Sequence, residues 1–279
     1  MNIGIVGLGL IGGSIGLKLQ RLKHTIYGVT NNNLNKKKAI ERNLANVVSC
    51  DLGILKECSL IILALPIKDL IHPSNDLINA IPKDSIVTDV GSIKEPIINT
   101  WGEIHPLFIG SHPMAGKEEK GVESGFESLL ENAKWIITPT SKTNSHSLKT
   151  LSNLITSMQC EICKASPKEH DEAVSLISHL PIFVASSLIK TAYKEQNKSL
   201  LDLTQNLAAT GFSDTTRVGG GNPNLGLDLA TNNQENILNA IKDFKNNINE
   251  IETLIKDKNW ELLSKKLTTA IEIRSKYIN

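Results

Sequence analysis

A glycine-rich turn near the N-terminus is the feature that most constrains the fold of this chain. Gly7, Gly9 and Gly12 form a G-x-G-x-x-G sequence between an apolar run at 3–6 and an apolar-periodic stretch at 11–22. Between a strand and a helix, this sequence is typical of a dinucleotide site. We expect the first glycine to allow a tight turn, the second to let the backbone approach a pyrophosphate, and the third to let helix and strand pack closely.

The first 165 of the 279 residues alternate short apolar runs with helical patterns. Strands alternating with helices indicate βαβ units, and therefore a mainly parallel sheet covered on both faces. We predict an α/β fold whose N-terminal, Rossmann-type domain spans residues 1–165. The predicted strands are 3–6, 25–29, 60–65, 85–90, 107–109 and 135–138.

Residues 166–279 carry no further strand signal and are expected to be all helical. The clearest helix has apolar residues spaced alternately by four and three positions. A helical segment of this size leaves apolar surface that a second copy can cover, so we predict a helical dimerisation and substrate domain and a homodimer. The alternative is an ordinary monomeric helical domain. The apolar stripe consists of Ile237, Ile241, Phe244, Ile248, Ile251 and Ile255.

The end of the second predicted strand indicates which dinucleotide is bound. NAD sites usually carry an acidic residue there, which accepts hydrogen bonds from the ribose 2′-hydroxyl. This chain has Thr30, Asn31 and Asn32, with no acid before Glu41. An acidic side chain would repel the 2′-phosphate that distinguishes NADP from NAD. The hydroxyl and amide groups of these three residues and the nearby Lys36 would not repel it, so we predict NADP. The other expected members of the cofactor site are Leu10, Ile11, Leu65 and Pro66.

Two segments follow predicted strands, at the edge where a doubly wound sheet presents its functional groups. They are Asp-Val-Gly-Ser-Ile-Lys at 89–94 and Gly-Ser-His-Pro-Met-Ala-Gly at 110–116. Of the seven histidines, His112 is the one expected to function, because a proline and flanking glycines hold it in an extended loop after a strand. His179 precedes Leu-Pro, which predicts a helix break near the site. His170 begins a helix and is ambiguous.

Together these segments resemble the prephenate/arogenate dehydrogenase family of tyrosine biosynthesis. The resemblance covers nearly the whole chain and implies a Rossmann domain followed by a helical dimerisation domain. It also implies oxidative decarboxylation of a cyclohexadienol, with a nicotinamide cofactor as hydride acceptor. The segments that carry it are the glycine-rich turn, 89–92, 110–116, His170-Asp171, 178–181 and 211–217.

The resemblance, read with the chemistry, assigns roles to four residues. A base of near-neutral pKa is needed at the ring hydroxyl, and His112 suits that task. Ser92 can orient the hydroxyl or the imidazole. Arg217 can hold a substrate carboxylate by a bidentate pair, and His179 is counted with the substrate-binding residues. No cluster has metal-ligand spacing, so no metal is expected.

One position departs from the family pattern. Many prephenate-using members have a second histidine directly after Ser-His-Leu-Pro, where this chain has Ile182. Loss of a donor there should weaken prephenate more than arogenate, so we predict oxidation of arogenate to tyrosine. Alternatives stay open: a prephenate dehydrogenase giving 4-hydroxyphenylpyruvate, a β-hydroxyacid dehydrogenase or imine reductase, and an NADP-sensing protein without turnover.

Composition argues against several other classes of protein. A net charge of +1 and 4% aromatic residues provide neither a basic surface nor a stacking platform for nucleic acid. Four cysteines are too sparse for a disulfide framework. No run reaches the ~18 apolar residues of a membrane span, and the N-terminus lacks the basic segment of a signal peptide. We therefore expect a cytoplasmic protein without a fused regulatory domain.

Overall fold

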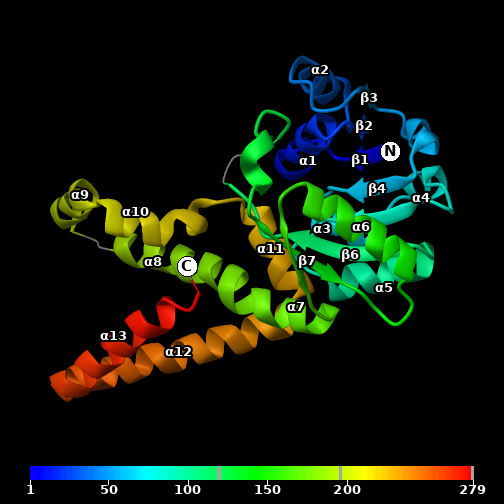
Figure 1. Ribbon diagram of the computed structural model, residues 1–279. Helices are drawn as coiled ribbons and strands as arrows, with labels where there is room; N and C mark the ends of the chain where they lie inside the picture. The colour runs from blue at the N-terminus through cyan, green and yellow to red at the C-terminus, as the bar shows by residue number, and fades with distance from the viewer. Residues whose placement is uncertain (118–120, 195–196, 278–279) are drawn as a thin grey trace. The chain divides into compact units, whose positions relative to one another are not determined.

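A computed structural model of the protein describes residues 1–117, 121–194 and 197–277. Contacts divide the chain into two compact units, Met1–Asn233 and Gln234–Asn279, which are described separately below. The first unit contains the whole sheet and helices α1 to α11 (Figure 1). The domain boundary predicted at residue 165 stays a prediction.

The first unit is built on one sheet of eight strands, in the order β3-β2-β1-β4-β5-β6-β7-β8. All neighbouring strands are parallel except β6 and β7, so the predicted α/β class with a mainly parallel sheet is confirmed. The strands are β1 (Asn2–Val6), β2 (Thr25–Val29), β3 (Val47–Ser49), β4 (Leu60–Leu63), β5 (Ile86–Asp89), β6 (Phe108–Pro113), β7 (Lys134–Thr138) and β8 (Glu161–Lys164). The two edge strands, β3 and β8, were not predicted.

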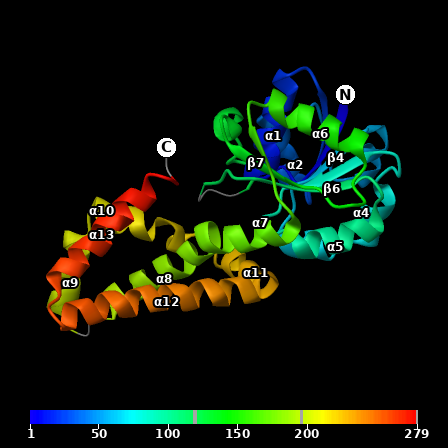
Figure 2. The same cartoon turned by 60° about the horizontal axis from the view of Figure 1, so that its bottom comes forward.

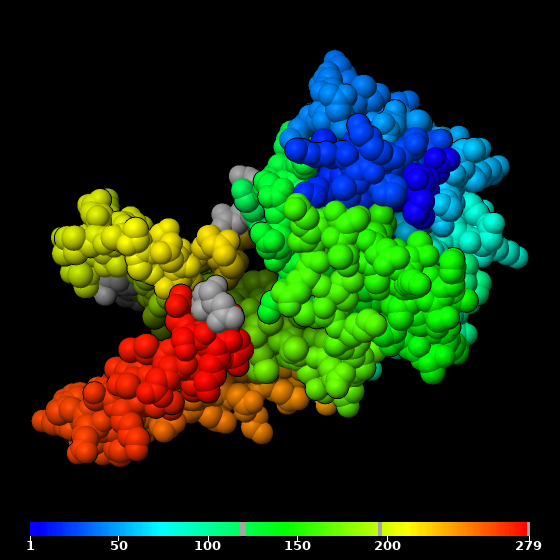
Figure 3. Space-filling view, viewed as in Figure 1, coloured from blue at the N-terminus to red at the C-terminus, as the bar shows by residue number. Residues whose placement is uncertain are grey.

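Helices cover both faces of the sheet. Figure 2 shows α1 and α6 on one face and α5 on the other, and the main apolar core packs α1 and α6 against the strands. The segment around η2 lies against α1 (Figure 3). Arg21 of α1 pairs with Glu127 of η2 at 2.8 Å. The helices are α1 (Leu10–Arg21), α2 (Asn33–Glu41), η1 (Leu52–Glu57), α3 (Ile67–Ile71), α4 (Asn75–Ala80), α5 (Glu95–Ile104), η2 (Glu127–Leu130) and α6 (Ser145–Ser157).

From residue 167 onward the described chain is helical, which confirms the prediction of an all-helical second half. A capping box begins α7: the Ser166 hydroxyl accepts from the Glu169 amide, and the Glu169 carboxylate accepts from the Ser166 amide. The predicted break near Pro181 is a π-helical turn, η3, placed directly before α8. The helices of the first unit are α7 (Pro167–Val174), η3 (Ser175–His179), α8 (Leu180–Tyr193), α9 (Lys198–Leu207), α10 (Thr210–Thr216), η4 (Arg217–Gly220) and α11 (Pro223–Asn232).

The second unit is a pair of helices, α12 (Gln234–Lys256) and α13 (Trp260–Arg274). The predicted apolar stripe lies on α12, so the expected helix is confirmed. Within this unit Lys266 on α13 pairs with Glu250 on α12. Burial decreases along the stripe: Ile237 is 3% exposed, whereas Ile248 and Ile255 are 47% and 49% exposed.

One expectation about membranes needs correction. The continuous helical stretch Pro167–Tyr193 is long and apolar enough to cross a bilayer by length and composition, although no such run was predicted. The same test is passed by core helices of soluble proteins. His170, Asp171 and His179 lie in this stretch with their side chains buried against other parts of the first unit. Only 22% of the apolar window is buried, so most of its apolar surface is exposed in the described chain.

Candidate active site

The glycine-rich turn has the geometry that its sequence predicts. Gly7 has a φ of +95°, which favours glycine, and a Cβ there would lie 2.2 Å from the Ala64 carbonyl oxygen. A Cβ on Gly12 would lie 1.9 Å from the Gly7 carbonyl oxygen, so strand and helix approach as closely as expected. At Gly9 a Cβ would meet no described atom within 4 Å, because the turn opens outward there.

This open turn fits a dinucleotide phosphate. Gly9 is the N-cap of α1 and supplies no side-chain hydrogen bond to the amides of the first helical turn. Those amides, which include Leu10 and Ile11, are therefore available to an anion at the helix N-terminus. Leu65 lies beside the turn, 3.5 Å from a Cβ built on Gly7, and Pro66 is the N-cap of α3.

The end of β2 carries polar groups and no acidic side chain. Thr30 is buried, with its hydroxyl 3.4 Å from the Asn32 carbonyl oxygen. Asn32 caps α2 by accepting from the Asn35 amide at 2.8 Å. The Asn31 side-chain oxygen accepts from the Asn32 and Asn35 amide groups, and its own Nδ2 donates to no described residue.

The lysines that follow differ in their partners. Lys37 lies 3.9 Å from Glu41, and Lys38 pairs with Glu123. Lys36 makes no ion pair with any residue in the described ranges. Of the three lysines, it is the one whose charge is not paired within the part of the chain that the structure describes.

The position of His112 differs from the prediction. His112 lies inside strand β6 and pairs with Ile136 of the antiparallel strand β7, rather than in a loop after a strand. The cause is a change of neighbour along β6: its first residues pair with β5, and residues 110–113 pair with β7. The ladder hydrogen bonds to β7, rather than Pro113 and the glycines, extend the chain at His112.

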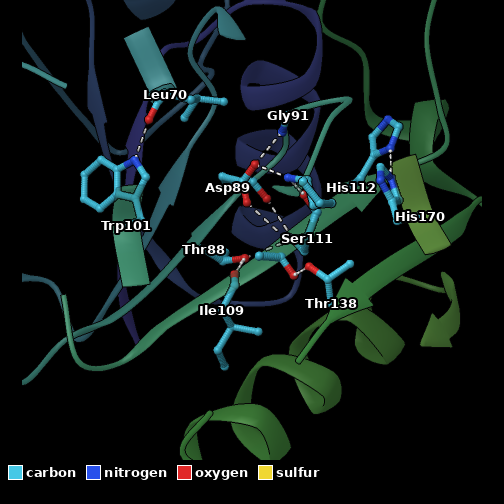
Figure 4. Close-up of polar contacts among 12 residues, drawn as sticks. Leu70, Thr88, Asp89, Gly91, Trp101, Ile109, Ser111, His112, Thr138 and His170 are labelled. Atoms are coloured by element: carbon cyan, nitrogen blue, oxygen red, sulfur yellow. Dashed lines mark hydrogen bonds and ion pairs between the residues drawn. The ribbon is translucent and has the colours of Figure 1, made fainter. Parts of the chain in front are cut away.

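A buried ion pair holds the residue before His112. Lys94 and Asp89 contact each other with fully buried side chains. The Asp89 carboxylate accepts from the Ser111 amide at 3.1 Å (Figure 4). The Lys94 ammonium donates to the Ser111 carbonyl at 2.8 Å. Ser111 also donates its hydroxyl to the Asp89 carbonyl and accepts from the Trp135 indole N–H. Both sides of the Ser111 backbone are therefore fixed, and with them the start of the His112 side chain.

The imidazole of His112 is oriented by another histidine. Its Nδ1 lies 2.9 Å from Nε2 of His170, and Nδ1 of His170 lies 2.7 Å from Oδ1 of Asp171 (Figure 4 shows the two rings). Burial lowers the pKa of His112 well below the ordinary value of 6.5, and the nearby His170 and Lys94 act in the same direction. His112 is therefore a neutral ring at physiological pH.

His179 presents a second buried imidazole. Its Nδ1 lies 3.2 Å from the Asn233 side-chain nitrogen, which donates, so its Nε2 carries the proton. This Nε2 is buried and has no hydrogen-bond partner with suitable geometry among the described residues, although the Ser92 backbone faces the ring. Burial lowers the pKa of His179 to about 4. His179 is 0% exposed and is not among the described residues that line the cavity around His112 and Arg217, so the structure does not bring it together with the other predicted substrate-binding residues there.

A cavity of about 860 Å³ brings predicted residues from both halves of the chain together. His112 lines it from the sheet, and Ile182 and Arg217 line it from α8 and η4. Gly219 lets η4 approach α8, because a Cβ there would lie 2.5 Å from the Ser186 backbone nitrogen. The described lining contains the cations Lys117 and Arg217, which favour an anionic ligand.

Ser92 and the His170-Asp171 pair depart from the expected roles. Ser92 lies in the turn between β5 and α5, and its hydroxyl bonds to no described side chain, so the orienter of the imidazole is His170. Sequence reasoning left His170 ambiguous and gave Asp171 no separate role. The available signal was a histidine next to an aspartate directly after a capping box, at the start of the helical half.

Comparisons with known proteins place the chain in a family. The nucleotide-binding domain of prephenate dehydrogenase matches residues 15–164, and its dimerization domain matches residues 166–269. The chain is 32% identical to the prephenate dehydrogenase of Bacillus subtilis over 278 residues, which cover 97% of this chain and 74% of the relative.

Two crystal structures resemble the whole chain. Synechocystis arogenate dehydrogenase is 38% identical, with a TM-score of 0.82 and full coverage of both chains. Prephenate dehydrogenase from A. aeolicus, in complex with hydroxyphenyl propionate and NAD⁺, is 30% identical, with a TM-score of 0.91 and coverage of 100% of this chain and 98% of that one. With both domains of the family matched in order, the chain belongs to the prephenate/arogenate dehydrogenase family of nucleotide-binding oxidoreductases.

Proposed function

We propose that the protein is a cytoplasmic homodimer that converts arogenate to tyrosine by oxidative decarboxylation, with NADP as the hydride acceptor. The observation that carries the proposal is the single cavity shared by His112, Ile182 and Arg217. A neutral base, an apolar wall and a cation are the groups that a cyclohexadienol with a carboxylate requires.

His112 acts as the base at the ring hydroxyl. Its buried, neutral imidazole takes the hydroxyl proton as the C4–H bond breaks, and the C1 carboxylate leaves as CO₂. When bound, the nicotinamide supplies the acceptor for the C4 hydride. The ring becomes aromatic, so the reaction runs in one direction. Of the two roles expected for Ser92, orientation of the substrate hydroxyl is the one that remains.

Positive charge in the cavity fixes the substrate. Arg217 lines the cavity and pairs with one substrate carboxylate. His179, also expected to contact the substrate, is 0% exposed and is not among the described residues that line the cavity, so we assign it no direct contact with the substrate.

The choice of arogenate rests on Ile182. Its side chain lines the cavity where many prephenate-using relatives have a histidine. An apolar residue donates no hydrogen bond to the keto group of prephenate. The loss of this donor should therefore weaken the binding of prephenate more than the binding of arogenate. Prephenate dehydrogenase activity is the second candidate, and the similarity to the Bacillus subtilis enzyme of that name favours it.

The choice of NADP rests on the end of β2. Asn31 offers an amide donor, and Lys36 offers a charge without an ion-pair partner in the described ranges. Residues 30–32 at the end of the strand include no acid that would repel a 2′-phosphate. Thr30→Asp would introduce that carboxylate. We expect it to shift the ratio of kcat/KM values from NADP toward NAD, and Thr30→Asn is the matched neutral control.

Dimerisation rests on the second unit. Ile248, Ile255, Trp260, Leu267 and Ile271 of α12 and α13 are each about half exposed or more. Apolar faces of this extent are usually covered by a partner, and the matching family domain is a dimerization domain.

A two-by-two assay tests the proposal. Arogenate and prephenate are each offered with NADP and NAD, and kcat/KM is measured for all four combinations. We expect arogenate with NADP to be the best pair. Equal or better turnover of prephenate with NAD would refute both preferences. Loss of kcat by about 10²-fold to 10⁴-fold in His112→Asn, with NADP binding retained, tests the role of the base.

A further inference from the structure

His112 is the first member of a buried chain of three polar side chains. His112 Nδ1 lies 2.9 Å from His170 Nε2, and His170 Nδ1 lies 2.7 Å from Asp171 Oδ1. All three side chains are nearly inaccessible, at 8%, 2% and 1% residue exposure. The partners of each nitrogen are therefore set by the protein rather than by water.

The Asp171 end of the chain determines the direction of the hydrogen bonds. Its two oxygens accept from the backbone amides of Lys94 and Glu95 at 2.7 and 2.8 Å. Because backbone amides only donate, both oxygens act as acceptors, as in an ionised carboxylate. His170 Nδ1 therefore carries a proton and donates it to Oδ1.

The tautomer of His112 follows from this direction. In a neutral His170 ring with Nδ1 protonated, Nε2 has a lone pair and accepts. The atom facing it is His112 Nδ1, which must then carry the proton. His112 Nε2 is left with the free lone pair, and His112 lines the cavity. If His170 were protonated instead, it would donate to His112 Nδ1, and the neutral His112 ring would carry its proton on Nε2.

The anchor of the chain is rigid. Asp171 caps the first amides of α5 and is held by Asn233, whose side chain donates to the Asp171 carbonyl at 2.9 Å. Asp171 and His170 come from α7, whereas His112 comes from β6. The helical half of the chain thus supplies the group that orients a side chain of the sheet.

We propose that His170 and Asp171 are positioning residues that hold His112 in the tautomer with Nδ1 protonated and Nε2 free, so that Nε2 is the atom that takes the substrate proton. This inference rests on the proposed role of His112 as the base. As Nε2 gains the proton, the positive charge of the ring strengthens its hydrogen bond to His170, and the Asp171 carboxylate stabilises that charge through the His170 ring.

Nitrogen NMR of the substrate-free protein tests the tautomer without any assay of turnover. Histidines are labelled with ¹⁵N, and the His112 signals are assigned by their loss in His112→Gln. We expect a protonated, pyrrole-type Nδ1 and an unprotonated, pyridine-type Nε2 at neutral pH. This is the minor tautomer of a free histidine side chain in water, so the opposite pattern overturns the proposal.

Two substitutions of His170 separate positioning from packing. His170→Leu removes the acceptor, whereas the Oε1 of His170→Gln can accept in place of Nε2. We expect kcat to fall by about 10²-fold or more in His170→Leu, since that is the scale on which a general base contributes, with KM and NADPH binding little changed. His170→Gln should recover kcat to within about tenfold of the native value and keep the His112 tautomer. The exposed His146→Leu serves as the matched control.

The outcomes distinguish this inference from the proposed function. If His112→Asn keeps native kcat, the base is elsewhere and the proposed function fails, whatever the tautomer is. If His112→Asn is inactive but His170→Leu keeps native kcat, His112 is the base and the positioning role is refuted. If His170→Leu does not fold, the NMR pattern of the native protein and the kcat of His170→Gln still test the proposal. A His112 ring protonated on Nε2 would overturn it. A loss of kcat in His170→Gln as large as the loss in His112→Asn would overturn it as well.

Discussion

The buried pair of Lys94 and Asp89 makes the stability of the sheet sensitive to one charge. Both side chains are fully buried, and burial lowers the pKa of Lys94 while Asp89 opposes that shift. In Lys94→Met the Asp89 carboxylate loses its counter-ion, although it keeps the amides of Gly91 at 2.8 Å and Ser111 at 3.1 Å. The Ser111 carbonyl also loses its donor.

The size of the effect follows from the cost of a broken buried pair. Removing one partner typically costs about 3–5 kcal/mol, and the two remaining amides favour the lower end of that range. For a unit of this size, 1 kcal/mol lowers the melting temperature by about 2–4 °C, so Lys94→Met should melt about 6–12 °C below the native protein. Kcat should fall as well, because Ser111 positions His112.

A matched surface pair provides the control. Lys142 lies 2.9 Å from Glu103, with both side chains about three-quarters exposed. Lys142→Met should leave the melting temperature unchanged, because solvent screens an exposed pair. The melting temperatures of the native protein, Lys94→Met and Lys142→Met are measured by thermal unfolding monitored by circular dichroism. Equal melting temperatures for Lys94→Met and Lys142→Met would refute the argument that the buried charge stabilises the sheet.

Three further predictions concern catalysis. Burial lowers the pKa of His112 below 6.5, so the imidazole stays neutral as the pH falls. We therefore expect kcat/KM to stay level from about pH 8 to about pH 6 and to decline only below that. A decline of kcat/KM on the acid side with a midpoint at about pH 6.5 or above would contradict this. Arg217→Ala should raise KM about tenfold or more with a smaller change in kcat, measured by steady-state kinetics, and an unchanged KM would remove Arg217 from the site. Ile182→His should raise kcat/KM for prephenate relative to arogenate, and an unchanged ratio would leave Ile182 as a packing residue.

Local sequence determined much of the fold. The glycine-rich turn at 7–12 depends on backbone conformations and close approaches that only glycine allows, so the turn and α1 could be predicted from it. The strands β1, β2 and β4 are neighbours in the sheet and consist mostly of apolar, buried residues. By contrast β3 and β8 lie at its edges, are short and are partly exposed, so they lack the apolar signal of the others.

The tertiary structure decided how the reactive group works. The sequence identified His112 as the candidate base, but not its place inside β6, because the pairing of residues 110–113 with β7 depends on register between distant segments. His170 stands 58 positions from His112, and Asp171 stands 77 positions from Lys94, so no local pattern links them. Burial, which keeps the imidazole neutral, exists only after the sheet and the helical half pack together. Residue type therefore determined which chemistry is available, and long-range packing determines which nitrogen of His112 is free for the proposed proton transfer.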